Sequence, residues 1–156
     1  MSEDVVQPTI ESVVSFRKVT KENLDAVLTL KVKPEQRNFV ADNAVSIAEA
    51  HFEPKAWYRA IYADETPVGF VMLHDDPQAG EYYLWRLMIG ARYQGLHFGE
   101  RAMQLLIDYV RTRPDATELL VTYVPAEGSP QPFYRRFGFV DSGEMSDGEV
   151  IMRLAL

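Results

Sequence analysis

The residues that most directly suggest chemistry lie in the segment Arg92-Tyr-Gln-Gly-Leu-His-Phe-Gly99. This segment follows an apolar run, residues 83–89, and leads directly into an amphipathic helical pattern. The start of a helix presents unpaired backbone N–H groups and the positive end of the helix dipole. Glycines let those amides approach a ligand closely because they carry no Cβ atom. The segment therefore predicts a site for an anion such as a phosphate or pyrophosphate.

A second candidate is Tyr134, which lies within the segment Pro132-Phe-Tyr-Arg-Arg-Phe-Gly-Phe139. A phenol has an ordinary pKa near 10, so at neutral pH it is protonated and able to donate its proton. The same side chain, beside Phe133 and Phe137, also fits the packing face of an amphipathic helix. From the residues alone packing is the better interpretation, and the catalytic one stays open.

Composition limits the classes of function. The chain has 156 residues, 47% of them hydrophobic, which suits one compact domain with a real core. Its net charge of −7 argues against a nucleic-acid partner and mildly favours a cationic substrate, although acidity also simply aids solubility. Cysteine is absent, which excludes disulfides, thiolate metal sites and a cysteine nucleophile. The three histidines are far apart in sequence, so we expect no metal.

We expect no secretory signal and no membrane span. The first four residues are Met-Ser-Glu-Asp, which are acidic and precede no apolar h-region, so no secretory signal is indicated. No run approaches the roughly 20 apolar residues that a membrane span needs, and no membrane partner is expected. The lack of cysteine fits a reducing compartment, and we expect a cytoplasmic protein.

Hydrophobic periodicity predicts a mixed arrangement of strands and helices. Thr20 is the expected N-cap of a first helix over residues 23–30, and the region 35–51 is expected to hold one or two short helices. The firmest helix follows Gly99, and a short one spans residues 129–137 with Gly138 as its C-terminal cap. The apolar stripe expected on the long helix is Phe98, Ala102, Leu105, Leu106, Tyr109 and Val110. The expected strands are residues 13–19, 57–63, 68–74, 81–89, 118–123, 139–142 and 149–154.

The order of these elements indicates an α/β (α+β) domain. Three consecutive strands joined by short turns, residues 57–89, suggest an antiparallel meander. The strand at 118–123 is expected to run parallel to 81–89 through a right-handed crossover. We expect a flexible N-terminus over residues 1–12 and a single domain over residues 13–156.

With its two motifs in this order after a meander, the chain resembles the GCN5-related N-acetyltransferase (GNAT) superfamily over nearly its whole length. The resemblance implies a twisted, mostly antiparallel sheet of about six or seven strands with about four helices and a splayed central parallel pair. Within the superfamily, residues 33–41 and Gly128-Ser-Pro-Gln-Pro132 are similar to the bacterial diamine (spermine/spermidine-type) acetyltransferases.

The resemblance implies that acetyl-CoA is the co-substrate and that the 92–99 loop wraps its pyrophosphate. His97 departs from the family pattern, because a glycine usually stands there; if that position needs a positive φ angle, histidine is penalised but tolerated. Backbone N–H groups of the preceding strand are implied to stabilise the oxyanion. The residues implied to bind acetyl-CoA are Leu87, Met88, Ile89, Arg92, Gln94, Gly95, Leu96, His97, Phe98, Gly99, Glu100 and Ser129.

The resemblance also implies that Tyr134 is the general acid that protonates the leaving thiolate. The acceptor is implied to be a primary amine, most specifically a polyamine, held by Trp85, Asp42 and Glu49. Glu81 and Glu127 are candidates for the base, which stays unassigned. Other amine acceptors (an amino acid, an aminoglycoside or a protein amine) and a non-catalytic acyl-CoA sensor stay open, and a homodimer is only a family-level expectation.

Overall fold

The computed structural model describes residues 6–156. These residues form one seven-stranded sheet in the order β1-β2-β3-β4-β5-β7-β6, together with four α-helices. The strands are β1 (Val14–Arg17), β2 (Ala56–Ala63), β3 (Thr66–Asp76), β4 (Glu81–Ile89), β5 (Glu118–Tyr123), β6 (Val140–Ser146) and β7 (Glu149–Ala155). The α-helices are α1 (Leu24–Thr29), α2 (Asn43–His51), α3 (Phe98–Arg111) and α4 (Gln131–Arg136).

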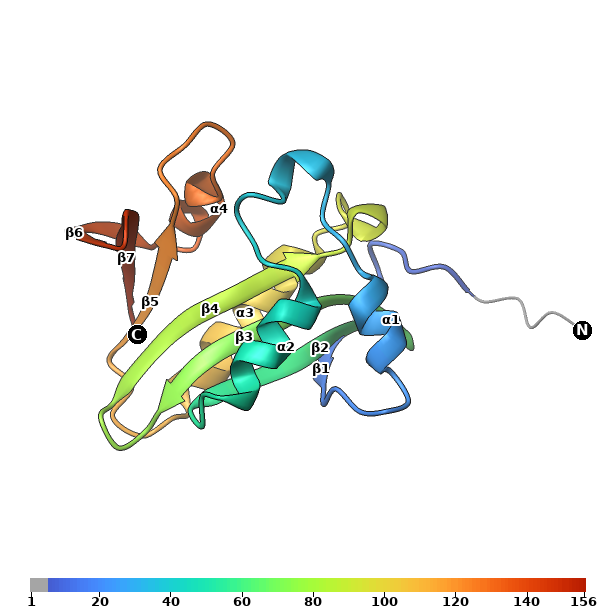
Figure 1. Ribbon diagram of the computed structural model, residues 1–156, viewed down its shortest axis with the longest axis horizontal. Coiled ribbons are helices and arrows are strands. Elements are labelled where there is room, and N and C mark those ends of the chain that lie inside the picture. Colours follow the sequence, from blue (N-terminus) through green and yellow to red (C-terminus); the bar gives the residue numbers. More distant parts are fainter. Residues whose placement is uncertain (1–5) are drawn as a thin grey trace, which may run out of the picture.

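The sheet is mostly antiparallel, as predicted. Strands β1 to β4 pair antiparallel in chain order, and β7 pairs antiparallel with both β5 and β6. Only β4 and β5 are parallel, and α3 makes the crossover between them. Helices α1 and α2 cover one face of the sheet and α3 covers the other (Figure 1). The predicted meander, parallel pair and fold class are therefore confirmed.

The two parallel strands part soon after they meet. Their pairing is limited to Tyr83 with Leu120 and Leu84 with Val121. At the next residue, Trp85, the β3–β4 register shifts, because Leu73 pairs with Leu84 while Met72 pairs with Arg86. A bulge of this kind bends a strand and increases its twist. Strand β5 then diverges from β4 toward α4, which leaves a gap at the centre of the sheet (Figure 1).

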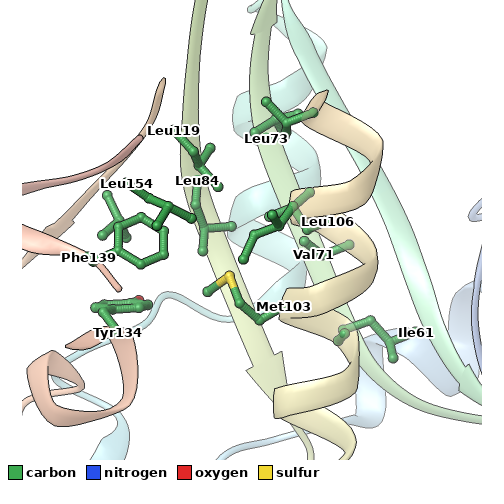
Figure 2. Close-up of a cluster of buried hydrophobic side chains, with 14 of the residues drawn as sticks. Ile61, Val71, Leu73, Leu84, Met103, Leu106, Leu119, Tyr134, Phe139 and Leu154 are labelled. Atoms are coloured by element: carbon green, nitrogen blue, oxygen red, sulfur yellow. The ribbon is translucent and has the colours of Figure 1, made fainter. Parts of the chain in front are cut away.

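The main core lies between the sheet and α3. Met103 and Leu106 of α3 point toward Val71 and Leu84 of the central strands (Figure 2). Fully burying a side chain of this kind stabilises the fold by about 1.5–3 kcal/mol. The predicted stripe was partly wrong, because Leu105 and Tyr109 are only partly buried. The residues of α3 that are buried are Phe98, Ala102, Met103, Leu106, Ile107 and Val110.

Two element boundaries differ from the prediction. Thr20 is not an N-cap, because α1 begins at Leu24 and Asn23 occupies the N-cap position. The Oδ1 atom of Asn23 instead accepts a hydrogen bond from the backbone N–H of Thr20 at 2.7 Å, which builds a turn before the helix. The last hairpin is also tighter than predicted, since β6 runs to Ser146 and only Asp147 and Gly148 separate it from β7.

The segment that precedes β1 makes specific contacts with the domain. A guanidinium nitrogen of Arg101, on α3, donates to the carbonyl oxygen of Ser12. The amide of Val13 donates to Oδ1 of Asp64 at 2.9 Å, in the β2–β3 turn. The flexibility expected of residues 1–12 stays a prediction, and residues 1–5 lie outside the described part of the chain.

Candidate active site

A cavity of about 840 Å³ occupies the gap between β4 and β5. Its walls come from β4 and β5, from the loop that leads into α3, from the segment around Ser129 and α4, and from the β6–β7 turn. The segment between α1 and α2 contributes Gln36, Phe39 and Val40 to the wall. We call the face of the sheet that α1 and α2 cover the α1–α2 face (Figure 1). The cavity thus lies where the two parallel strands are no longer paired.

The N-terminus of α3 lies at one end of this cavity. Gly95, His97, Phe98, Gly99 and Glu100 all line it, and together they form the first turn of a 14-residue helix and the loop before it. Gly95 has φ +85°, and a Cβ atom added there would meet nothing within 4 Å. This open, glycine-bearing helix start presents backbone N–H groups to the cavity, as an anion site requires.

His97 adopts the left-handed conformation, with φ +62° and ψ +19°, at the N-cap position of α3. Position 97 therefore has the positive φ angle at which a histidine is expected to be penalised but tolerated. The ring is 56% exposed, and its Nδ1 atom lies 3.2 Å from Oε2 of Glu100. The other oxygen of Glu100 lies 3.1 Å from Nη1 of Arg136 on α4. That pairing offsets the negative charge that Glu100 would otherwise bring to an anion site.

Tyr134 lines the cavity from α4 and is buried, with only 9% of its surface exposed. Its ring packs on Phe133 at a centroid distance of 5.7 Å and on Phe139 at 5.8 Å. Figure 2 shows the rings of Tyr134 and Phe139 side by side. Within residues 6–156 its hydroxyl makes no hydrogen bond. Burial, and secondarily the negative charge of Glu149, raises the pKa of the Tyr134 hydroxyl to about 12. Tyr134 is thus both a packing residue and a protonated donor that lacks an acceptor.

Several charged side chains on the α1–α2 face form ion pairs. Arg86, on β4, lines the cavity and lies 3.4 Å from Glu49 of α2. Asp42 lies 3.3 Å from the ammonium of Lys31. Neither Glu49 nor Asp42 is among the residues that line the cavity, whereas Trp85 is. Of the three residues predicted to bind the acceptor, the structure brings only Trp85 to the cavity, and the role of all three stays a prediction.

The sequence of this chain matches a protein family and a characterised type of enzyme. The profile of the Acetyltransferase (GNAT) family matches residues 20–139, which is most of the chain. The chain belongs to this family. The spermine/spermidine N(1)-acetyltransferase of Bacillus subtilis (strain 168) is 25% identical over 150 residues, which cover 89% of this chain and 96% of that protein.

Solved structures agree with the fold of this acetyltransferase. A domain from Methanocaldococcus jannaschii DSM 2661 aligns with a TM-score of 0.74 at 14% identity, covering 94% of this chain and 100% of that one. The PaiA N-acetyltransferase of Thermoplasma acidophilum, in complex with coenzyme A, aligns with a TM-score of 0.68 at 15% identity, covering 92% of this chain and 99% of that one. At such identities the likeness supports the fold alone.

Most of the residues expected to bind the co-substrate of this acetyltransferase lie around the cavity. Those that line it are Leu87, Met88, Ile89, Gln94, Gly95, His97, Phe98, Gly99, Glu100 and Ser129. Two others do not line it: Arg92 donates to Oε1 of Gln7 at 3.0 Å, and Leu96 packs against the main core. Gln94 supports the loop, because its Nε2 atom donates to the carbonyl oxygen of Ile89 at 2.9 Å.

Sequence reasoning missed the wall of the acetyltransferase cavity that β5 and β7 build. Thr122, Asp147 and Glu149 line it, and Oγ1 of Thr122 donates to Oε2 of Glu149 at 3.0 Å. Neither candidate for the base, Glu81 or Glu127, is among the lining residues. Alternation along residues 149–154 could have placed Glu149 opposite the core face, but not next to Tyr134.

One group of potential metal ligands lies outside this cavity. The structure brings His74, Asp76 and Glu81 together across the β3–β4 hairpin, with one ligand atom of each within 4.8 Å of the others. Linear spacing of histidines did not indicate this group, since two of its members are carboxylates. The ammonium of Lys55 lies 2.6 Å from Oδ2 of Asp76 and already pairs with that carboxylate. Among the described helices, none combines the length and apolar character needed to cross a membrane.

Proposed function

We propose that this chain transfers the acetyl group of acetyl-CoA to a primary amine, by direct attack of the amine on the thioester. The observation that carries the proposal is one cavity that joins the N-terminus of a long helix to the buried Tyr134 hydroxyl, which has no partner within residues 6–156. The first is suited to bind phosphate groups, and the second is suited to give a proton to a leaving thiolate.

The residues present fit acetyl-CoA. We expect the amides at the start of α3 to bind its pyrophosphate, because Gly95 and residues 97–100 line the cavity and Gly95 leaves open space beside that loop. Past Leu84, β4 has no pairing with β5, so the gap is free for the extended pantetheine arm. Backbone groups of Leu87, Met88 and Ile89, which line this gap, are the donors proposed for the thioester oxygen.

Each bond change in the transfer has a partner. The nitrogen lone pair forms a C–N bond to the thioester carbon, the C–S bond breaks, and the sulfur takes a proton from Tyr134. The acylated nitrogen then loses its extra proton to solvent, and the Tyr134 phenolate regains a proton from solvent. The amine must first lose its own proton to solvent, because a lysine-like amine of pKa about 10.4 is neutral in only roughly one molecule in a few thousand at pH 7. Tyr134 suits the donor role because its hydroxyl is protonated at neutral pH and lies on the wall of this cavity.

We further propose that the acceptor is a polyamine. The named relative from Bacillus subtilis acts on spermine and spermidine, and the chain carries a net charge of −7. Within residues 6–156, the charged residues of the cavity wall that form no ion pair are two carboxylates, Asp147 and Glu149. Unpaired carboxylates favour a cationic ligand over one that carries its own carboxylate.

The test is release of thiol from acetyl-CoA in the presence of a panel of amines: spermidine, glycine and kanamycin. We expect amine-dependent thiol release with spermidine and little with the other two. Equal or better turnover of glycine or kanamycin would replace the polyamine with another acceptor and leave the acetyl transfer standing. Binding of acetyl-CoA with no turnover of any amine would instead make the chain an acyl-CoA sensor.

A further inference from the structure

Two side chains of β5 and β7 that line the cavity project to the α1–α2 face of the sheet. Val121 of β5 and Met152 of β7 are buried in the core against α3. Because side chains alternate along a strand, Thr122 and Glu149 project to the opposite face, which α1 and α2 cover. Thr122 and Glu149 line the same cavity as Trp85 and Arg86 of β4, and we expect the amine to approach the thioester from this side.

Glu149 carries a charge that its surroundings leave uncompensated. Its Oε2 atom accepts the hydrogen bond from Thr122, which holds the carboxylate in place. Of the other charged residues of the cavity wall, Arg86 pairs with Glu49 and Glu100 pairs with Arg136, whereas the exposed Asp147 of the β6–β7 turn forms no ion pair within residues 6–156. Within residues 6–156, Glu149 forms no ion pair. A fixed and partly buried carboxylate without a cation is suited to receive one from a ligand.

The carboxylate lines the same cavity as the Tyr134 side chain. Its negative charge contributes, after burial, to the raised pKa of the Tyr134 hydroxyl, so the two groups interact through space. The Tyr134 hydroxyl is the group assigned to the sulfur of the thioester, and the attacking nitrogen approaches the carbon bonded to that sulfur. A cation at the attacking nitrogen therefore falls within the electrostatic range of Glu149.

We propose that Glu149 is the catalytic carboxylate that binds the reacting amine and offsets the positive charge that develops on its nitrogen. This inference rests on the proposed acetyl transfer. As the C–N bond forms, the nitrogen gains positive charge until its proton passes to solvent, while the C–S bond breaks and sulfur takes the proton of Tyr134. A carboxylate fixed beforehand stabilises that charge without reorganising. Thr122 is the residue that positions it.

The central experiment compares Glu149→Gln with the wild-type enzyme in kcat/KM for the amine. Glutamine keeps the shape and still accepts the hydrogen bond from Thr122, so the fold is expected to hold, as thermal unfolding will show. We expect kcat/KM for the amine to fall about 100-fold, while KM for acetyl-CoA changes by less than about twofold. Glu149→Asp, which keeps the charge, should lose only about tenfold.

Two amines of equal length locate the effect. 1,4-Diaminobutane and n-butylamine share the reacting end, but only the diamine carries a second ammonium. Equal losses for both amines in Glu149→Gln are expected, because Glu149 acts at the reacting nitrogen. A loss confined to the diamine would overturn that assignment and make Glu149 a contact for the remote ammonium.

Two further variants separate the proposed role from a structural one. Glu144→Gln makes the same change on the same hairpin, at an exposed residue that lies outside the cavity wall and 3.9 Å from Arg153, and should leave kcat/KM unchanged. Thr122→Val removes the donor and should lower kcat/KM, whereas Thr122→Ser keeps the donor and should restore it. Normal kcat/KM in Glu149→Gln, with an active wild type, would overturn the inference alone. An inactive wild type would instead overturn the proposed acetyl transfer.

Discussion

His97 offers a sharp test of how the loop before α3 binds its ligand. The left-handed conformation at φ +62° costs a non-glycine residue about 1 kcal/mol, the low end of the usual range. Glycine can adopt the same conformation without this steric cost, because it has no Cβ atom. Glycine returns part of that gain, about 0.5 kcal/mol, through the greater entropy of the unfolded chain. The contact with Glu100 is exposed on both sides and contributes little. We therefore expect His97→Gly to be more stable by about 0.5 kcal/mol, a rise of about 1–2 °C in Tm.

The same substitution should strengthen binding of acetyl-CoA. The ring lines the cavity beside the helix amides, so a ligand that reaches those amides must order or displace it. Ordering one side chain costs about 0.5–1.5 kcal/mol, which corresponds to a two- to tenfold lower Kd once the ring is removed. Isothermal titration calorimetry with acetyl-CoA measures the Kd, and thermal unfolding measures the stability.

Two control variants separate the backbone from the ring. His97→Ala removes the ring but keeps the strained backbone, so it should improve binding without the gain in Tm. Asp115→Gly relieves another positive φ angle, +53°, at a residue outside the cavity wall, so it should not weaken stability and should leave the Kd unchanged. Weaker binding and a lower Tm in His97→Gly would refute the reasoning, because the imidazole would then itself hold the loop or the ligand.

Two further predictions concern Tyr134. Tyr134→Phe should lower kcat by about 100-fold or more, while the Kd for acetyl-CoA stays close to that of the wild type. Assays of thiol release measure kcat, and calorimetry measures the Kd. An unchanged kcat would show that Tyr134 is not the proton donor. The second concerns stability at high pH. Because the pKa is about 12 in the folded protein and near 10 when unfolded, the unfolded state loses this proton first, so the contribution of Tyr134 is intact below pH 10 and is lost as the pH rises toward 12. Between pH 10 and pH 12 the free energy of unfolding of the wild type should fall by about 2–3 kcal/mol relative to that of Tyr134→Phe. Denaturant titration at each pH measures both free energies. The same dependence on pH in the two proteins would contradict the raised pKa.

The fold was predictable where periodicity and local turn signals agree. Strands β4 and β5 were predicted with the observed bounds, because each is a run of apolar residues between clear turns. The stripe of α3 failed in part, because helical spacing admits Met103 and Ile107 as well as Leu105, and only contact with the sheet decides among them. Thr20 failed as a cap because Asn23, three residues later, competes for the same turn.

Some residues of the candidate site could be predicted from the sequence, and others could not, for the same physical reason. The loop before α3 was accessible to sequence reasoning, because the strand, the glycines and the helix that form it are contiguous in the chain. Residues whose role depends on neighbours that are distant in the sequence were not accessible to sequence reasoning. Asp42 and Glu49 looked available as carboxylates, yet Lys31 and Arg86, brought near by folding, pair with them. Whether a carboxylate is unpaired depends on which cations the fold brings near it, and the sequence alone does not tell this.

Glu149 is the clearest case of a residue that only the fold makes interesting. It lies 15 residues after Tyr134 in the chain, beyond a turn and a strand that carry no motif. Antiparallel pairing of β7 with β5 brings it to Thr122, and the divergence of β5 from β4 turns that corner into a cavity wall. The bulge at Trp85 and the short β4–β5 pairing are therefore as important for the proposed chemistry as any side chain, because without them the sheet would close and Tyr134 and Glu149 would share no cavity.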